Sequence, residues 1–242
     1  MRVPRFYQPS PLTVDTLISL DDNCVQHIAR VLRMKPDEAI ILFNGDGCEY
    51  TGRLVDVEKR RVSVQITACD TPTRISPLNI HIGQSISRGD RMDYAVQKST
   101  ELGMNALTPL LSDRCEVKLK ADRLEKKQLQ WQQLAISACE QSLRTHIPSI
   151  NSPITIDEWI INCDAQVKLV LHHHSIKPLG DYIPPTSAAL LVGPEGGLTQ
   201  REVDLALSHG FQPVTFGPRV MRTETAPVAA LSVLQYLWGD LS

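Results

Sequence analysis

The sequence predicts an α/β protein made of a small β-rich domain followed by a larger domain in which strands and helices alternate. Up to residue 70, short apolar runs are separated by turn residues and a single helical pattern occurs, which is typical of a small β-barrel. From residue 78 onward, strand and helix patterns alternate, which favours a largely parallel sheet with covered faces. Pro72 and Pro77 interrupt these patterns among polar residues, so we place the domains at residues 1–73 and 74–242.

The N-terminal domain should contain five strands and one helix. Asp21 or Asp22 can cap a helix that ends near Met34 and turns Val25, Ile28, Ala29 and Leu32 to one face. Asn44-Gly45-Asp46-Gly47 lies between two apolar runs and predicts a hairpin. The expected strands are residues 2–7, 16–20, 39–43, 50–57 and 62–66.

The C-terminal domain should contain five strands and four helices. Thr199 and Glu202 have the spacing of a capping box, which predicts a helix directly after them, and Thr225 can cap the last helix. Residues 154–161 give no clear pattern. The expected strands are residues 78–86, 106–111, 167–171, 188–192 and 214–216, and the other helices are residues 92–102 and about 121–143.

Two strands of this domain each end in a loop that contains glycine and proline and leads into a helix. The first loop is Gly193-Pro194-Glu195-Gly196-Gly197, and the second runs from Gly217 to Ala226. Carboxyl ends of parallel strands share one edge of a sheet, and ligands of open α/β sheets bind at that edge. Glycine also lets backbone groups approach a ligand closely. The two loops are therefore the predicted binding site.

The chemistry of the loops leaves the ligand open. A helix begins directly after residue 199, and a helix N-terminus can hold a phosphate. However, the chain has neither a P-loop ending nor a Gly-x-Gly-x-x-Gly fingerprint. Glu195 is also unfavourable beside a phosphate, and it suits a cationic, ribose-bearing or amide-like ligand better.

The overall composition is that of an ordinary soluble globular protein. Of the 242 residues, 42% are hydrophobic and 21% are charged, and no apolar run approaches the roughly 18 residues of a membrane span. The N-terminus lacks the apolar segment of a secretory signal, so we expect a cytoplasmic protein. The six cysteines are dispersed without a Cys-x-x-Cys pair, which indicates reduced thiols rather than disulfides or zinc ligands.

The net charge of −2 neither indicates nor excludes a nucleic-acid partner. Basic residues gather locally in the N-terminal domain, where a rim of such side chains can follow a phosphate backbone. A solvated charged face explains the same residues equally well. They are Arg2, Arg5, Arg30, Arg33 and Lys35.

His172-His173-His174 is the one segment that suggests a metal site. Adjacent residues at the end of a strand point to opposite faces, so they seldom converge on one ion. No carboxylate or cysteine lies nearby at ligand spacing. We therefore expect no metal at this segment.

The chain resembles the bacterial 16S ribosomal RNA uridine-N3 methyltransferases of the SPOUT superfamily over nearly its whole length. The resemblance is carried by Val31-Leu32-Arg33, Phe43-Asn44-Gly45, Gln97 to Gly103, Ser112 to Cys115, Ala138 to Gln141 with Arg144 and Pro148, Gly193 to Gly197, and Gly217 to Ala226. It implies a PUA-like RNA-binding domain followed by a homodimeric SPOUT domain with a C-terminal trefoil knot. It also implies S-adenosylmethionine as cofactor and uridine N3 in the small ribosomal subunit as methyl acceptor. Strand and helix order alone would predict an unknotted sheet.

The resemblance also assigns residues to the site. Arg222, Glu224 and Arg219 are the catalytic candidates, and Arg88 joins the basic residues above as an RNA contact. Arg222 or Arg219 could stabilise negative charge on the uridine carbonyls. Glu224 could take the N3 proton, or it could only orient Arg222 or a backbone amide. The cofactor would lie against Leu171, His172, Gly193, Pro194, Glu195, Gly196, Gly197, Phe216, Gly217, Val220, Met221, Arg222, Thr225 and Ala226.

Two other functions fit the residues. A phosphate-binding nucleotide enzyme would use the same glycine loops, and calorimetry with ATP or NAD would detect it. A non-enzymatic RNA-binding or ribosome-assembly protein could retain only the fold, which a turnover assay would reveal.

Overall fold

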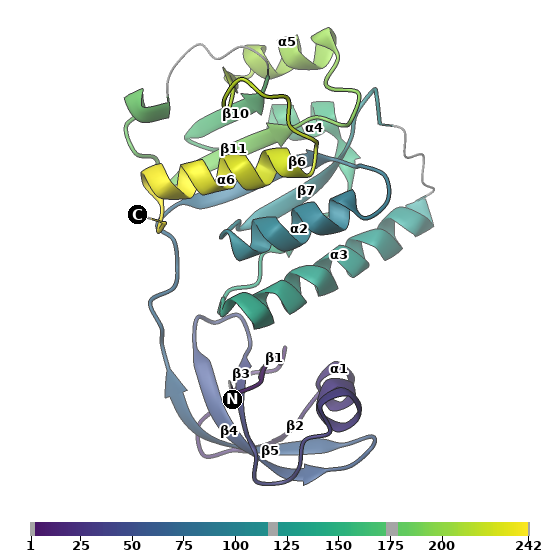
Figure 1. Cartoon of the computed structure of the whole chain (residues 1–242), viewed down its shortest axis with the longest axis vertical. Helices are drawn as coiled ribbons and strands as arrows, with labels where there is room; N and C mark the ends of the chain where they lie inside the picture. The colour runs from purple at the N-terminus through teal and green to yellow at the C-terminus, as the bar shows by residue number, and fades with distance from the viewer. Residues whose placement is uncertain (1–2, 116–120, 173–178, 242) are drawn as a thin grey trace. The chain divides into compact units, whose positions relative to one another are not determined.

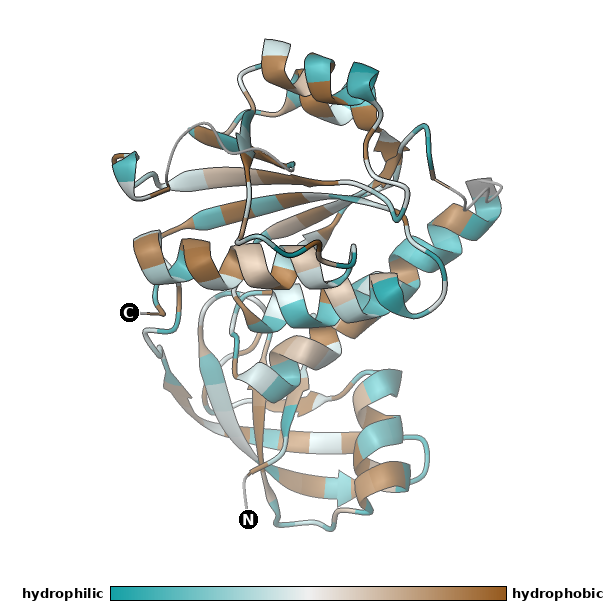
Figure 2. Cartoon of the chain, turned by 45° about the horizontal axis from the view of Figure 1, so that its top comes forward, coloured by the Kyte–Doolittle hydropathy of each residue, from teal (hydrophilic) through white to brown (hydrophobic). Residues whose placement is uncertain are grey.

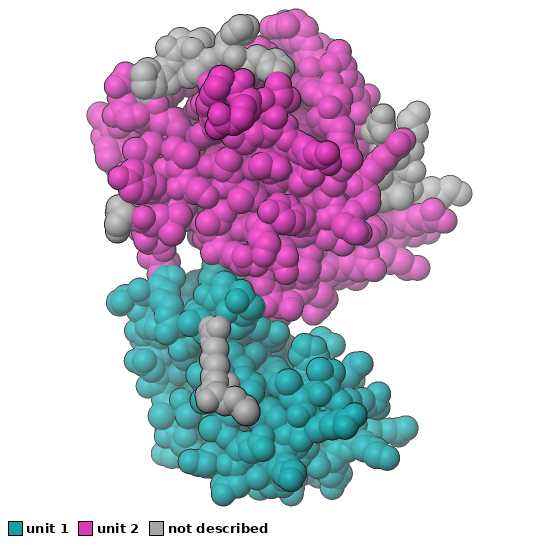
Figure 3. All heavy atoms as spheres, in the orientation of Figure 1, with its two compact units in different colours: residues 1–74, 139–147 teal, residues 75–138, 148–242 magenta. Residues whose placement is uncertain are grey.

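A computed structural model describes residues 3–115, 121–172 and 179–241 of the chain. It divides the chain into two compact units (Figure 3). Unit 1 consists of Met1–Arg74 and Cys139–Ile147, and unit 2 consists of Ile75–Ala138 and Pro148–Ser242. The first segment of unit 1 ends in the proline-containing stretch expected to separate the domains, whereas its second segment comes from the middle of the chain.

Unit 1 is built on a mixed five-stranded sheet with the strand order β1-β3-β4-β5-β2. The predicted hairpin is confirmed, because β3 and β4 pair in antiparallel register across a turn in which Gly45 and Gly47 have φ values of 97° and 96°. The side-chain oxygen of Gln8, which follows β1, accepts a hydrogen bond from Asp21 N, which follows β2, at 3.1 Å. The strands are β1 (Arg5–Tyr7), β2 (Leu17–Ser19), β3 (Ala39–Phe43), β4 (Glu49–Val57) and β5 (Val62–Asp70).

The helix of unit 1 departs from its predicted geometry. Asp21 caps it as expected, but α1 (Asp22–Val25) continues as a π-helix, η1 (Gln26–Leu32). A π-helix bonds residue i to i+5, so each residue turns through a smaller angle than in an α-helix. Val25 and Ile28 are buried as predicted, whereas Leu32 is 49% exposed. The prediction that Leu32 packs inward is therefore wrong.

Arg5 attaches residues 139–147 to the sheet of unit 1. Its guanidinium donates to Glu49 Oε1 at 2.9 Å, to Cys139 O at 2.8 Å and to Arg144 O at 2.7 Å. It also lies 3.9 Å from the ring centroid of Phe43. Burial lowers the pKa of Arg5, an effect that Glu49 partly offsets. Since the arginine stays charged at any physiological pH, these acceptors are necessary to keep it inside the protein.

Unit 2 contains a parallel sheet with the strand order β12-β10-β11-β6-β7-β8, and β9 pairs with β7 (Figure 1). Every pairing in this sheet is parallel, as predicted from the alternation of strands and helices. The strands are β6 (Asn79–Ser85), β7 (Ala106–Leu111), β8 (Ser149–Ile150), β9 (Ile154–Thr155), β10 (Val167–Leu171), β11 (Ser187–Val192) and β12 (Gln212–Val214).

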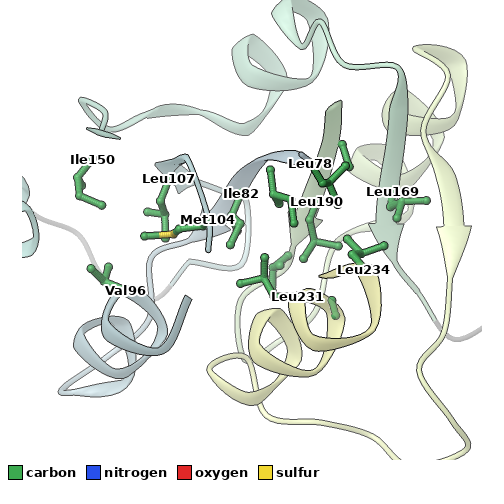
Figure 4. Close-up of a cluster of buried hydrophobic side chains, with 14 of the residues drawn as sticks. Leu78, Ile82, Val96, Met104, Leu107, Ile150, Leu169, Leu190, Leu231 and Leu234 are labelled. Carbon is green, nitrogen blue, oxygen red and sulfur yellow. The ribbon is translucent and has the colours of Figure 1, made fainter. Parts of the chain in front are cut away.

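Helices cover both faces of this sheet. Alternate residues of β11 point to opposite faces, so Leu190 belongs to the core cluster that includes residues of α2, α3 and α6, whereas Leu191 belongs to the cluster that includes residues of α4 and α5. Figure 4 shows Leu231 and Leu234 of α6 directed at the sheet, near Leu190. The helices are α2 (Arg91–Glu101), α3 (Ala121–Ser142), α4 (Ile156–Asn162), η2 (Leu179–Asp181), α5 (Gln200–Ser208) and α6 (Thr225–Trp238).

Hydrophobic residues recur along the whole of α6, whereas the first turns of α3 are largely hydrophilic (Figure 2). None of the helices in the described ranges combines the length and apolar character needed to cross a membrane.

Three local predictions in unit 2 need correction or completion. The strand expected at 214–216 is β12 (Gln212–Val214), which lies at the edge of the sheet and so tolerates Pro213 without losing an inner ladder bond. Thr225 does not cap α6, because it is the first helical residue and Glu224 holds the cap position without a side-chain bond. The ambiguous residues 154–161 form β9 and most of α4. The trefoil knot stays a prediction.

Candidate functional site

A cavity of about 1010 Å³ lies at the carboxyl edge of the sheet of unit 2, where the two glycine-proline loops meet. Strands β12, β10, β11 and β6 are consecutive neighbours, so their parallel order brings the segments that follow them to one edge (Figure 1). The prediction that the loops lie together is confirmed by their joint lining of this cavity. In the structure, the helices that follow begin at Gln200 and Thr225, so the first loop extends over residues 193–199 and the second loop over residues 215–224.

Most of the predicted cofactor residues line the cavity. Thr225 is the exception, because it is exposed on the first turn of α6 and is absent from the lining. The three catalytic candidates Arg219, Arg222 and Glu224 also line it. The predicted cofactor residues in the lining are Leu171, His172, Gly193, Pro194, Glu195, Gly196, Gly197, Phe216, Gly217, Val220, Met221, Arg222 and Ala226.

The first loop is shaped by glycine and by the helix that follows it. Gly197 has a φ of 71°, and its N–H donates to Pro194 O at 2.9 Å. A Cβ at Gly193 would lie 3.2 Å from Leu198 N, so a larger residue would require the backbone at Leu198 to shift by a few tenths of an ångström. These two positions explain why the loop requires glycine.

Glu202 fastens the end of the first loop. The predicted capping box is confirmed, with Glu202 Oε2 accepting from Thr199 N at 2.7 Å. The other carboxylate oxygen accepts from Asp113 N, just after β7, at 2.8 Å. Glu202 is fully buried and both of its oxygens are bonded, so it holds two strand-end segments together.

Glu195 is engaged by protein groups on the α2 side of the cavity. Its Oε1 accepts from the Arg91 guanidinium at 2.7 Å and from Arg88 N at 3.1 Å. Burial alone would raise the pKa of Glu195, but hydrogen bonds from backbone N–H groups and from Arg91 lower it overall. The charge of Glu195 is therefore balanced within the protein, and it does not by itself select the ligand.

The second loop is more exposed. Arg219 and Arg222 are exposed, and Val220 is 84% exposed. The loop closes on α6 through Arg222 O, which accepts from Thr225 N and Ala226 N, both at 3.0 Å. Buried Thr223 points inward, and its hydroxyl donates to Gly193 O of the first loop at 2.8 Å.

Glu224 combines two features that bear on its predicted role. It holds the cap position of α6, where the helix N-terminus favours a negative charge. Its Oε2 is buried and has no hydrogen-bond partner among the described residues. A buried carboxylate oxygen without a partner is costly, which makes it a candidate contact for a bound molecule.

Two arginines that the sequence interpretation did not assign also line the cavity. Arg91 pairs with Glu195, and Arg114 donates to Gly196 O at 2.9 Å. Arg114, Arg219 and Arg222 form no ion pair within the described part of the chain. Arg114 lies three residues after the end of β7, a predicted strand, and the strand order is what shows that this end lies at the same edge as the two loops.

The predicted RNA-binding residues do not form one group. Arg30, Arg33 and Lys35 are exposed in and after η1, whereas Arg88 is exposed beside the cavity in unit 2. The side chain of Arg5 is buried and its donors are used inside unit 1, so we remove it from the RNA-binding set. Arg2 lies outside the described residues.

His172 lines the cavity, and its backbone N–H donates to Val214 O at 3.1 Å. His173 and His174 lie outside the described residues. Within the ranges that the structure covers, no three His, Cys, Asp or Glu side chains are grouped to hold a metal ion.

Comparisons with known proteins identify the family. Residues 74–235 match the RNA methyltransferase domain family, and residues 20–67 match the RNA methyltransferase PUA domain family. The ribosomal RNA small subunit methyltransferase E of Buchnera aphidicola (strain Sg) is 34% identical, with 100% of this chain and 99% of the relative covered. The protein of the same name from Bacillus subtilis is 32% identical, with 90% and 89% covered. The chain belongs to the ribosomal RNA small subunit methyltransferase E family.

Two solved structures share the fold over the full chain. The enzyme of this name from Neisseria gonorrhoeae, bound to S-adenosylmethionine, has a TM-score of 0.93 at 44% identity with both chains fully covered. A Legionella pneumophila protein described as a methyltransferase, in complex with the same cofactor, has a TM-score of 0.97 at 43% identity, also with full coverage. The predicted PUA-like and SPOUT-type architecture is confirmed by these family and structure matches.

Proposed function

We propose that this protein transfers the methyl group of S-adenosylmethionine to N3 of a uridine in 16S ribosomal RNA. The observation that carries the proposal is the cavity between the two loops, in a chain that matches two cofactor-bound relatives over its full length. The family supports ribosomal RNA of the small subunit as the substrate. Uridine N3 as the acceptor follows from the resemblance of the loop sequences.

The cavity suits S-adenosylmethionine in size and lining. Its volume of about 1010 Å³ is at the upper end of the range for small-molecule sites. The first loop offers backbone groups at Gly196 and Gly197, and Leu171 and Phe216 supply apolar walls. When bound, the cofactor supplies an electrophilic methyl group, and the protein holds donor and acceptor in line.

The second loop supplies the groups that act on the uridine. Loss of the N3 proton leaves negative charge on the two flanking carbonyls, and Arg222 or Arg219 can stabilise it. Both arginines are exposed at the cavity and free of ion pairs among the described residues. The unpartnered Oε2 of Glu224 supports this residue as the proton acceptor or as the group that orients Arg222.

RNA binding is proposed for the exposed basic residues. Arg30, Arg33 and Lys35 belong to unit 1, and Arg88 lies beside the cavity. Each can neutralise a phosphate, which positions the RNA without reading its sequence. The substrate state that we propose is the assembled small ribosomal subunit, and the location is therefore the cytoplasm.

We also propose a homodimer. α6 packs its buried side against the sheet, yet it leaves an exposed side with Val233 at 36%, Tyr236 at 63% and Leu237 at 39% exposure. Exposed apolar residues clustered on one helix are typical of a protein interface. Sedimentation of the purified protein tests this part, and a monomer at micromolar concentration would contradict it.

Methyl transfer is tested with purified protein, labelled S-adenosylmethionine and small ribosomal subunits that lack the modification. We expect label in 16S RNA, and nuclease digestion with mass spectrometry should identify 3-methyluridine. Label on a base carbon or a ribose oxygen would contradict the proposed acceptor. Cofactor binding without any transfer would favour the RNA-binding or assembly function, and binding of ATP or NAD instead would favour a nucleotide enzyme.

A further inference from the structure

The two loops of the cavity are joined by a buried chain of hydrogen bonds through Thr223. Its hydroxyl donates to Gly193 O at 2.8 Å and accepts from Gln84 Nε2 at 3.0 Å. Thr223 is 7% exposed and Gln84 is fully buried. A hydroxyl that is shielded from water and satisfied on both sides contributes more than a surface contact does.

The direction of this chain follows from the chemistry of its members. A backbone carbonyl can only accept, so the single proton of the Thr223 hydroxyl must point at Gly193 O. Thr223 Oγ1 then accepts from Gln84, which places the amide nitrogen rather than the amide oxygen toward it. The bond to Gly193 O therefore fixes the direction of the Thr223 hydroxyl, and the hydroxyl in turn fixes the orientation of the Gln84 amide.

Gln84 has a fixed position at one end of this series of hydrogen bonds, because its backbone belongs to the sheet. It lies in β6, where it pairs in register with Val192 of β11, the residue directly before Gly193. The side chain of Thr223 thus connects the exposed second loop to the ends of β6 and β11, and the first loop follows β11. Arg222 and Glu224 are the sequence neighbours of Thr223, so a shift of Thr223 moves both.

We propose that Thr223 is a positioning residue that sets the second loop, with Arg222 and Glu224, against the first loop, and that Gln84 orients its hydroxyl. This inference rests on the methyl transfer proposed above. Thr223 does not need to touch the reacting atoms for this role. Its effect is geometric, and misplacement of a reacting group by about 1 Å can lower a rate by roughly 100-fold.

The decisive variants are Thr223→Val, which keeps the shape and removes the hydroxyl, and Thr223→Ser, which keeps the hydroxyl. For Thr223→Val we expect kcat to fall by about 10- to 100-fold while the Kd of S-adenosylmethionine changes by less than about threefold. Thr223→Ser should stay within about threefold of the wild type in kcat. Equal losses in the two variants, or an unchanged kcat in Thr223→Val, would overturn the proposal.

A matched control separates positioning from general destabilisation. Thr100→Val removes a fully buried hydroxyl that donates to Val96 O at 2.8 Å within α2, and Thr100 does not line the cavity. We expect a similar fall in Tm for Thr100→Val and Thr223→Val but a normal kcat for Thr100→Val. If Thr100→Val and Thr223→Val lose kcat in proportion to their fall in Tm, the result would contradict a positioning role.

Hydrogen exchange provides a second readout that needs no RNA. With S-adenosylmethionine bound, amides of residues 219–226 should exchange faster in Thr223→Val than in the wild type and in Thr223→Ser. Unchanged exchange would overturn the coupling of the loops. The wild type could bind the cofactor and transfer no methyl group while exchange is still faster in Thr223→Val. In that case the proposed function fails, and the coupling of the loops stands.

Discussion

The two loops of the cavity are built on the same plan but are held in different ways. The first loop is fixed from several directions, by Arg91, Arg114 and the buried Glu202. The second loop exposes Arg219, Val220 and Arg222. Within the described residues, Thr223 provides its side-chain hydrogen bonds to the first loop and to β6, and Phe216 packs against the apolar core. Under the proposed function, the first loop would form a fixed wall of the cofactor site, whereas the second loop would contribute both to the cofactor site and to the groups that act on the RNA.

The largest effect is expected from the exposed loop. Arg222→Ala should lower kcat by about 100- to 1000-fold, the range seen when one charge-stabilising donor is lost, and should change the Kd of S-adenosylmethionine far less. Single-turnover kinetics together with calorimetry measure the two quantities. Arg219→Ala is the matched variant, and a larger loss there would transfer the role to Arg219. A normal rate in both variants would remove the arginines from the reaction.

The first loop should respond in stability and in cofactor binding. Glu202→Ala leaves Thr199 N and Asp113 N without their buried acceptor, so we expect a loss of about 1–3 kcal/mol in the free energy of unfolding. The Kd of S-adenosylmethionine should rise as well, because the loop loses its fixed end. Urea unfolding and calorimetry test both effects. Glu125→Ala, at an exposed position of α3, should change stability by less than about 0.5 kcal/mol.

RNA binding through unit 1 should leave both loops unaffected. Arg30→Ala and Lys35→Ala should each reduce the slope of log Kd against log salt concentration by about 1 if the side chain contacts a phosphate. Cofactor affinity should not change. Filter binding at several salt concentrations measures the slope, with Lys59→Ala as a control at an exposed lysine outside the predicted set. A weaker affinity of Arg30→Ala for S-adenosylmethionine would contradict the prediction that RNA and cofactor bind at separate sites.

The smallest effect is expected from the ion pair of the first loop. The Arg91 and Glu195 side chains are 40% and 26% exposed, so their attraction is screened by water and contributes at most about 1 kcal/mol. The folded protein holds the pKa of Glu195 below its ordinary value. Its contribution is therefore complete above about pH 4.3 and is lost as the pH falls through the lowered pKa. Arg91→Gln should remove part of this acid dependence, which unfolding curves between pH 3 and 7 would reveal.

The sequence predicts best those features that depend on neighbouring residues. The bounds of β3, β7 and β10 match the expected strands because each is a compact apolar run that stops at turn or polar residues. The capping box at Thr199 and the turn around Gly45 are likewise local. Their geometry is set mainly by hydrogen bonds and φ angles within a few residues.

Features that depend on contacts between residues far apart in the sequence could not be predicted from neighbouring residues. Arg5 was expected on an RNA surface, but its acceptors Cys139 O and Arg144 O lie 134 and 139 residues away. Leu32 was expected inside, and the π-helix that turns it outward has no signal in hydrophobic spacing. The assignment of Arg91 and Arg114 to the cavity required the strand order, which brings their segments to the same edge.

The attachment of residues 139–147 to unit 1 also affects the order in which the chain can fold during synthesis. The N-terminal sheet is translated early, yet Arg5 has two of its acceptors in residues that are made much later. Until then, its guanidinium must remain hydrated or find substitute partners. Unit 1 is therefore completed only after more than half of the chain has been synthesised, and a fragment that ends at residue 74 lacks part of its own interior.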